Sequence, residues 1–147
     1  MRLVIQRVNH ASVEMNETGT KNCINQGMVV LLAISKDFTY EKIDKAINKI
    51  LKLRIWKSDI KGFDKNIEEI KGEILIISQF TLFGDCLRSS KPDFKRSAQY
   101  ETAFSAYTKF IEKLKQSTSL VVKTGEFGAY MKVNLENDGP VTLILDI

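Results

Sequence analysis

Residues 74–82 have the sequence Ile74-Leu75-Ile76-Ile77-Ser78-Gln79-Phe80-Thr81-Leu82. Four apolar residues in a row are typical of a strand buried on both faces of a sheet. The polar residues that follow stand where this strand leaves the core. If the strand continued, Gln79 and Thr81 would share one face. Spacing alone leaves two interpretations open: a strand end capped by polar side chains, or the floor of a site whose backbone N–H groups receive an oxyanion.

A second informative stretch is Asn137-Asp138-Gly139-Pro140-Val141-Thr142. It joins two runs in which apolar and polar residues alternate, 131–136 and 141–145. These runs predict an antiparallel hairpin with 137–140 as its turn. Glycine relieves the steric conflict with the following proline and lets a ligand approach the backbone closely. The Gly139–Pro140 bond can be cis at small cost, and the sequence leaves cis and trans open.

Hydrophobic periodicity elsewhere predicts a β-rich chain with two helices. Further strands are expected over residues 3–15, 22–26, 28–35 and 120–123. The first helix should run from about residue 40 to Trp56, with Thr39 as its cap and Phe38 packed on Ile43 across that cap. The second should bury the stripe Ala103, Phe104, Tyr107, Phe110, Ile111 and Leu114. This order predicts one α/β domain over residues 1–147, with an antiparallel or mixed barrel-like sheet and two main covering helices.

Composition limits the class of protein. Hydrophobic residues make up 44% of the 147 and charged residues 27%, which is ordinary for a soluble globular chain. The longest apolar run, 28–34, is too short to span a bilayer, and the first residues do not resemble a signal peptide. Cys23 and Cys86 lie far apart and are most simply free thiols in a reducing compartment. We therefore expect a cytoplasmic protein with no membrane partner.

The sequence offers few groups for side-chain catalysis. His10 is its one histidine and has no carboxylate or second ligand beside it in the sequence. No P-loop, dinucleotide fingerprint, HExxH or CxxC occurs, so we expect no cofactor and no metal ion. Phe127 between Gly125 and Gly128 leaves two interpretations open, stacking on a base and filling the core.

Basic residues permit a polyanionic partner such as tRNA, but the net charge of +4 is modest. The loop 83–96 concentrates four cations, and phosphate contacts and a solvated surface are equally good interpretations of it. These cations are Arg88, Lys91, Lys95 and Arg96. A lysine stripe on the first helix favours a solvated outer face over an RNA contact. Its members are Lys42, Lys45, Lys49 and Lys52.

Taken together, the two motifs resemble those of the D-aminoacyl-tRNA deacylases. That family's Ser-Gln-x-Thr motif matches Ser78-Gln79-Phe80-Thr81, and its Asn-x-Gly-Pro-Val-Thr motif matches residues 137–142. The similarity extends along the whole chain, including the opening Ile5-Gln6-Arg7-Val8 and the segment Gly125-x-Phe127-Gly128-Ala129-x-Met131. Two separated motifs in the expected order are much more specific than either alone.

The resemblance implies a homodimer that hydrolyses the ester between a D-amino acid and the terminal ribose of tRNA. It implies that Gly139 and Pro140, joined by a cis bond, line the partner's pocket and exclude L side chains. Achiral glycine has no side chain to exclude, so mischarged glycyl-tRNA is a possible further substrate. The catalytic pocket would comprise Ser78, Gln79, Phe80 and Thr81. Substrate would also meet Asn137 and Phe127, the latter near the terminal adenosine.

The sequence leaves the mechanism of hydrolysis open. Thr81 is a candidate nucleophile, but no base is evident to activate it. The resemblance favours attack by water assisted by the 2′-hydroxyl of the tRNA, with backbone N–H groups near Phe80 and Thr81 holding the oxyanion. The loop 88–94 departs from the family's pattern, because Lys91 replaces an arginine and lacks its planar fork. Two rival functions remain: a non-catalytic nucleic-acid-binding protein, and a small esterase acting on substrates other than RNA.

Overall fold

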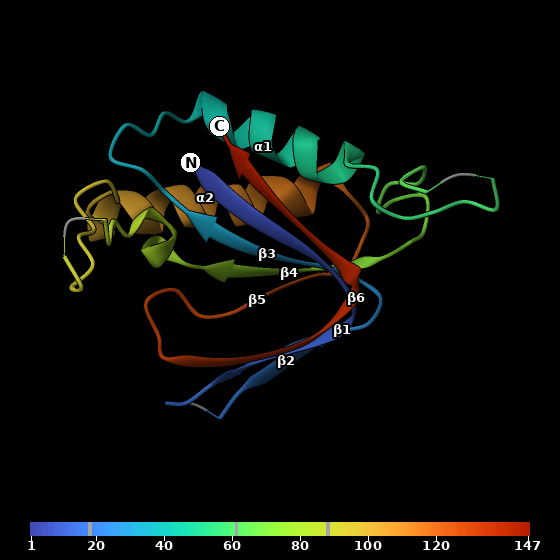
Figure 1. The fold of residues 1–147 in the computed structure, drawn as a ribbon, viewed down its shortest axis with the longest axis horizontal. Helices are drawn as coiled ribbons and strands as arrows, with labels where there is room; N and C mark the ends of the chain where they lie inside the picture. The colour runs from blue at the N-terminus through green and yellow to red at the C-terminus, as the bar shows by residue number, and fades with distance from the viewer. Residues whose placement is uncertain (18, 61, 88) are drawn as a thin grey trace.

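A six-stranded sheet carries two helices side by side on one of its faces (Figure 1). The structure is a computed structural model that describes residues 1–17, 19–60, 62–87 and 89–147; the expectation for Arg88 lies outside the described residues. The strands are β1 (Arg2–Met15), β2 (Lys21–Ile24), β3 (Gly27–Ala33), β4 (Glu73–Ser78), β5 (Val122–Thr124) and β6 (Met131–Asp146). The helices are α1 (Glu41–Lys52), α2 (Tyr100–Ser117) and the short 3₁₀ helix η1 (Phe80–Phe83).

The sheet is mixed. Its order is β2-β1-β3-β4-β5, with β6 also paired to β1. Strand β1 is antiparallel to β2, β3 and β6, whereas β3, β4 and β5 run parallel. Parallel neighbours need a long crossover, and α1 and α2 supply the two crossovers. The predicted mixed, barrel-like sheet with two covering helices is therefore confirmed.

The sheet is buried on both faces because it curls. Ile74 and Ile76 of β4 belong to the larger core cluster, which packs under α1 and α2. Leu75 and Ile77 belong to a second cluster. The second half of β1, the first half of β6 and strand β2 also contribute side chains to it. Each of these four residues is at most 1% exposed. The four-residue apolar run is thus a doubly buried strand, as its sequence predicts.

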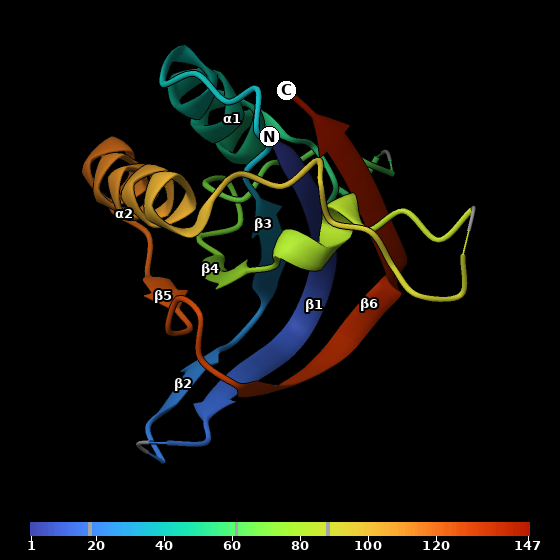
Figure 2. The same cartoon turned by 90° about the vertical axis from the view of Figure 1, so that its left-hand side faces the viewer.

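The predicted hairpin over 131–145 is wrong. Residues Met131–Asp146 form one strand, β6, which follows β1 along its whole length (Figure 2). The pairing passes from Gln6↔Thr142 directly to Val8↔Asn137, so four residues, 138–141, lie opposite Arg7 alone. The turn-forming residues therefore make a wide bulge inside a strand. Both halves of β6 pair with the same long neighbour, and this pairing outweighs the local turn preference.

Three smaller expectations are also corrected. The strand β4 ends at Ser78 and the chain turns into η1, so Gln79 and Thr81 do not alternate on an extended strand. Helix α1 ends at Lys52 rather than near Trp56, and its cap is Tyr40 with no side-chain hydrogen bond, not Thr39. Strand β5 begins at Val122 rather than Leu120. Within the described residues, no helix is long and apolar enough to cross a membrane.

Candidate active site

The polar residues after β4 sit on a tight connection between the sheet and η1. The backbone N–H of Gln79 donates to the carbonyl oxygen of Leu32 at 2.8 Å, which extends the β3–β4 pairing to the point where the chain turns. The hydroxyl of Ser97 donates to the carbonyl oxygen of Phe80 at 3.1 Å. The first N–H groups of a helical turn have no partner inside it. The described residues offer no backbone acceptor for the N–H groups of Phe80 and Thr81 outside η1.

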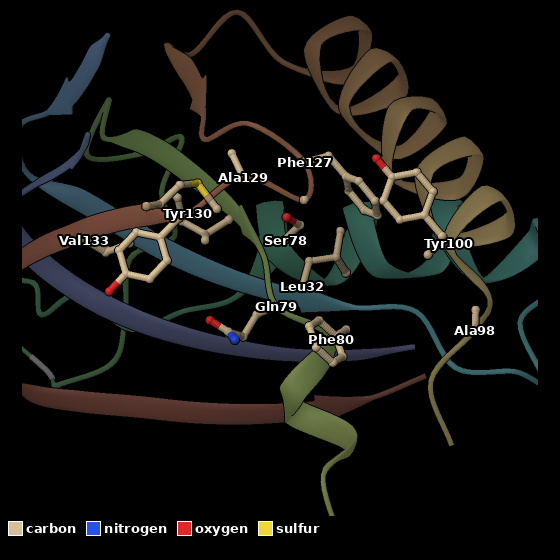
Figure 3. Close-up of a pocket in the computed structure, with 14 residues that line it drawn as sticks. Leu32, Ser78, Gln79, Phe80, Ala98, Tyr100, Phe127, Ala129, Tyr130 and Val133 are labelled. Atoms are coloured by element: carbon tan, nitrogen blue, oxygen red, sulfur yellow. The ribbon is translucent and has the colours of Figure 1, made fainter. Parts of the chain in front are cut away.

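A cavity of about 560 Å³ opens beside this connection (Figure 3). That volume is typical of sites for small molecules or for part of a larger ligand. Fourteen residues line it: Leu32, Ile77, Ser78, Gln79, Phe80, Ala98, Tyr100, Ala103, Phe127, Gly128, Ala129, Tyr130, Met131 and Val133. Sequence motif and cavity therefore coincide at Ser78, Gln79 and Phe80.

One wall of the cavity is aromatic. The ring of Phe127 lies 5.4 Å from the ring of Tyr100 and 5.3 Å from that of Tyr107, measured between centroids. The Tyr107 hydroxyl donates to the carbonyl oxygen of Ile76 at 3.3 Å, and burial raises the pKa of this phenol, so it stays neutral. Phe127 is half-buried and packs against the larger core cluster. Phe127 packs against the core, as one interpretation of its sequence holds, and also lines the cavity, whereas its stacking on a base stays a prediction.

Thr81 lies on η1 but does not line the cavity. Its Oγ1 accepts a hydrogen bond from the side-chain amide Nε2 of Gln79. An amide N–H cannot take up a proton, so this contact does not activate the hydroxyl as a nucleophile. The imidazole of His10 lies beside the carboxylate of Glu136, with 3.5 Å between Nδ1 and Oε2. Within the described residues, no group of three His, Cys, Asp or Glu side chains is placed to hold a metal ion.

The second motif is held outside the cavity. Gly139 and Pro140 are exposed, and the bond between them is cis, which answers the question that the sequence leaves open. Arg7 fixes the bulge: its Nε lies 3.0 Å from both the carbonyl oxygen and Oδ2 of Asp138, and its Nη1 donates to the carbonyl oxygen of Ile55. Asn137, Gly139 and Pro140 do not line the cavity of their own chain.

The basic loop has a defined shape between η1 and α2. Asp85 and Asp93 form an antiparallel bridge across it. Lys95 pairs with Asp93 at 3.0 Å, and the guanidinium of Arg96 lies over the ring of Phe83 at 5.5 Å. Hydrogen bonds from Lys95 lower the pKa of the Asp93 carboxyl. The side chains of Lys91, Lys95 and Arg96 remain exposed.

Sequence reasoning missed three residues of this region. Tyr100 and Tyr130 line the cavity, and Arg7 holds the bulge. Tyr100 stands three residues after Ser97, whose hydroxyl bonds to η1, and periodicity cannot reveal this proximity in space. Tyr130 lies inside the recognised Gly125–Met131 segment, so its position there was an available signal. Arg7 lies in the opening segment Ile5-Gln6-Arg7-Val8 that the resemblance includes, but its pattern did not point to the bulge, because an arginine on a strand usually faces solvent.

Comparison with known proteins gives a consistent result. A family model described as D-Tyr-tRNA(Tyr) deacylase matches residues 4–146. A D-aminoacyl-tRNA deacylase of Thermosipho melanesiensis is 49% identical over 146 residues, with 99% of this chain and 97% of the relative covered. One from Prosthecochloris aestuarii is 46% identical, with 99% of each covered.

Two solved structures share the fold. One, a c-Myc DNA unwinding element binding protein, is 39% identical with a TM-score of 0.92 and covers 100% of this chain and 99% of its own. The other, described as a "probable eukaryotic D-amino acid tRNA deacylase", is 18% identical with a TM-score of 0.86. It covers 99% of this chain and 98% of its own. At that identity the second likeness concerns the fold alone.

Proposed function

This chain belongs to the D-aminoacyl-tRNA deacylase family, and from that premise we propose that the cavity beside Ser78, Gln79 and Phe80 is its active site. The chain is an ester hydrolase that deacylates D-aminoacyl-tRNA. In the proposal the cavity receives the D-aminoacyl ester and the terminal adenosine of the tRNA. The observation that carries it is that Ser78, Gln79 and Phe80, three residues of the motif, line this cavity. Its aromatic wall at Phe127 suits a nucleobase.

Chirality is proposed to come from Gly139 and Pro140 of a second copy of the chain. Two facts support this assignment. The pair is exposed and firmly held by Arg7, and it stands away from the cavity of its own chain. In a homodimer with a two-fold axis, each bulge would enter the other subunit's cavity and leave no space for an L side chain. Glycine has no side chain, so glycyl-tRNA would pass the same filter.

The proposed reaction is attack by water on the ester carbonyl carbon. The 2′-hydroxyl of the tRNA assists this attack, and the ribose 3′-oxygen leaves. The backbone N–H groups of Phe80 and Thr81 point from the start of η1 without backbone acceptors, which suits them to the developing oxyanion. Thr81 is assigned to the pocket geometry rather than to nucleophilic attack, because its hydroxyl accepts a hydrogen bond from Gln79 and no base among the described residues contacts it.

The tRNA body is proposed to pass over the basic loop, where Lys91, Lys95 and Arg96 are exposed. The proposed location is the cytoplasm. Two exposed free cysteines, Cys23 and Cys86, suit a reducing compartment.

The deciding experiment compares the two enantiomers of one substrate. Purified protein should release D-tyrosine from D-Tyr-tRNA and leave L-Tyr-tRNA nearly intact. Gln79→Ala should lower the D-specific rate, whereas Asn48→Ala on the exposed face of α1 should not. Comparable rates on both enantiomers would refute the chiral filter, and full activity in Gln79→Ala would refute the assignment of the cavity.

A further inference from the structure

Two aromatic side chains at the start of α2 are exposed although they belong to an apolar stripe. Tyr100 is 60% exposed and Phe104 is 49% exposed. Sequence periodicity places Phe104 in the core, so its exposure contradicts that expectation. The two rings lie one helical turn apart, parallel within 6°, with centroids 6.3 Å apart. We call Tyr100 and Phe104 together the aromatic pair.

Neighbouring groups hold the aromatic pair in place. The ring of Phe127 meets both members edge-on, at 5.4 Å from each centroid. On another side, Tyr100 lies close to the backbone of Gly128: a Cβ added there would stand 3.3 Å from Tyr100 Cε2. Gly128 has φ +77°, a conformation that glycine adopts freely. The aromatic pair is therefore ordered before any ligand arrives, which lowers the entropy cost of stacking on it.

The aromatic pair continues the wall of the cavity toward solvent. Tyr100, Phe127 and Gly128 all line the cavity, whereas Phe104 lies behind Tyr100 and outside the lining. Figure 3 shows Tyr100 beside Phe127 below the first turn of α2, on the opposite side from Tyr130 and Val133. A chain that leaves the cavity on this side meets the exposed part of Tyr100 first.

We propose that Tyr100, supported by Phe104, stacks the base of the nucleotide that precedes the terminal adenosine of the tRNA. This inference rests on the proposed function, which places that adenosine in the cavity. The acceptor end of tRNA is single-stranded, so its next base is free to lie on a ring. Stacking on an aromatic ring recognises any base by its π face and needs no hydrogen-bonding group. The pair therefore suits an enzyme that accepts many tRNAs through one shared end.

The test uses two substrates that differ only in the RNA beyond the terminal adenosine. D-tyrosyl-tRNA contains the preceding nucleotide, and D-tyrosyl-adenosine lacks it. Tyr100→Ala should raise KM for D-tyrosyl-tRNA about tenfold, with kcat little changed, because one stacked base is lost. Because Tyr100 also lines the cavity that receives the adenosine, the same variant should raise KM for D-tyrosyl-adenosine by a clearly smaller factor. Tyr100→Trp should restore the wild-type KM, since it restores a large flat ring.

Controls separate stacking from other causes. Phe63→Ala removes another exposed ring, in the loop between Trp56 and Lys65, and should change neither KM. Thermal unfolding and sedimentation of Tyr100→Ala should match the wild type. An altered oligomeric state would overturn the proposal by assigning the aromatic pair to an interface between copies.

The remaining outcomes are equally decisive. An equal rise in KM for both substrates would place the adenosine itself, or the amino acid, on Tyr100 and overturn the proposal. An unchanged KM for D-tyrosyl-tRNA would do the same. Gln79→Ala, measured in parallel, tests the assignment of the cavity separately. If this variant deacylates both substrates as the wild type does, the proposed active site is refuted whatever the result for Tyr100→Ala.

Discussion

The contact between Gln79 and Thr81 assigns roles to two polar side chains that the sequence cannot separate. Gln79 lines the cavity and donates to Thr81, while Thr81 is exposed on η1 and does not line the cavity. A nucleophilic hydroxyl needs a base that accepts its proton, and an amide N–H is a donor. We therefore propose that Thr81 orients Gln79.

Replacement of Thr81 should be tolerated. Thr81→Ala removes one hydrogen-bond partner of Gln79, worth about 1 kcal/mol, so kcat on D-Tyr-tRNA should fall by less than about tenfold. Steady-state deacylation measures this, with Thr81→Ser as the control that keeps the hydroxyl. Complete inactivity of Thr81→Ala, together with an acyl ester at Thr81 found by mass spectrometry of the wild type, would instead establish a nucleophile.

Single residues also mark the limits of what the sequence predicts. The motif Ser78–Thr81 could be placed at a strand end because the preceding apolar run is unambiguous. The bend at Gln79, with φ −148° and ψ 74°, could not, because it depends on pairing with Leu32 of another strand. Phe104 follows helical spacing, yet its side chain is 49% exposed and its ring meets Tyr100 and Phe127.

At the scale of elements, the bulge in β6 is the feature that local rules misjudge. Asn-Asp-Gly-Pro has every property of a turn, and a turn would pair the two halves of β6 with each other. Both halves pair instead with β1, whose contacts with residues 131–146 are distant in the sequence. Strand positions and strand burial were predictable from periodicity, but the choice of partner strand was not.

Arg7 should be the residue on which this bulge depends. Its side chain is 13% exposed and bonds to Asp138 and to the carbonyl oxygen of Ile55. Arg7→Ala leaves these acceptors without their charged donor, so we expect the free energy of unfolding to fall by about 2–3 kcal/mol and deacylation to fall at least tenfold. Chemical denaturation and kinetics on D-Tyr-tRNA measure the two effects.

A second pair between β1 and β6 provides the matched control. Arg2 bonds to Asp146 at 2.7 Å, but the Asp146 side chain is 60% exposed. Asp146→Ala should cost at most about 1 kcal/mol and leave activity unchanged, because exposed ion pairs contribute little. Arg7→Lys should not restore activity, since an ammonium cannot reproduce the guanidinium fork. Equal effects of Arg7→Ala and Asp146→Ala would show that the bulge needs no anchor.

At the scale of the whole molecule, the two motifs that identify the family occupy different surfaces. One lines the cavity and the other projects from the bulge. From the sequence resemblance we expect the two motifs to meet across a two-fold axis. Local pattern cannot test that expectation, because the contact joins two chains.

Subunit complementation should reveal a shared site. Mix Gly139→Val, whose side chain is too large for the bulge to enter a pocket, with Gln79→Ala, whose pocket is impaired. In a mixed dimer one site would carry both lesions and the other neither. Random pairing of equal amounts should then restore about a quarter of wild-type activity, measured on D-Tyr-tRNA. Mixed dimers that form but stay inactive would show that each site belongs to a single chain.

The wide bulge has a consequence for how this chain tolerates insertions and deletions. Gln6 pairs with Thr142 on one side of it and Val8 pairs with Asn137 on the other, so the length of segment 138–141 does not set the register of the sheet. A residue gained or lost there changes only what projects from the bulge, whereas the same change elsewhere in β6 would turn every following side chain to the opposite face. The length of segment 138–141 can therefore vary while the pairing of β1 with β6 on either side keeps its register. Libraries that vary this length are the natural starting point for altering substrate choice.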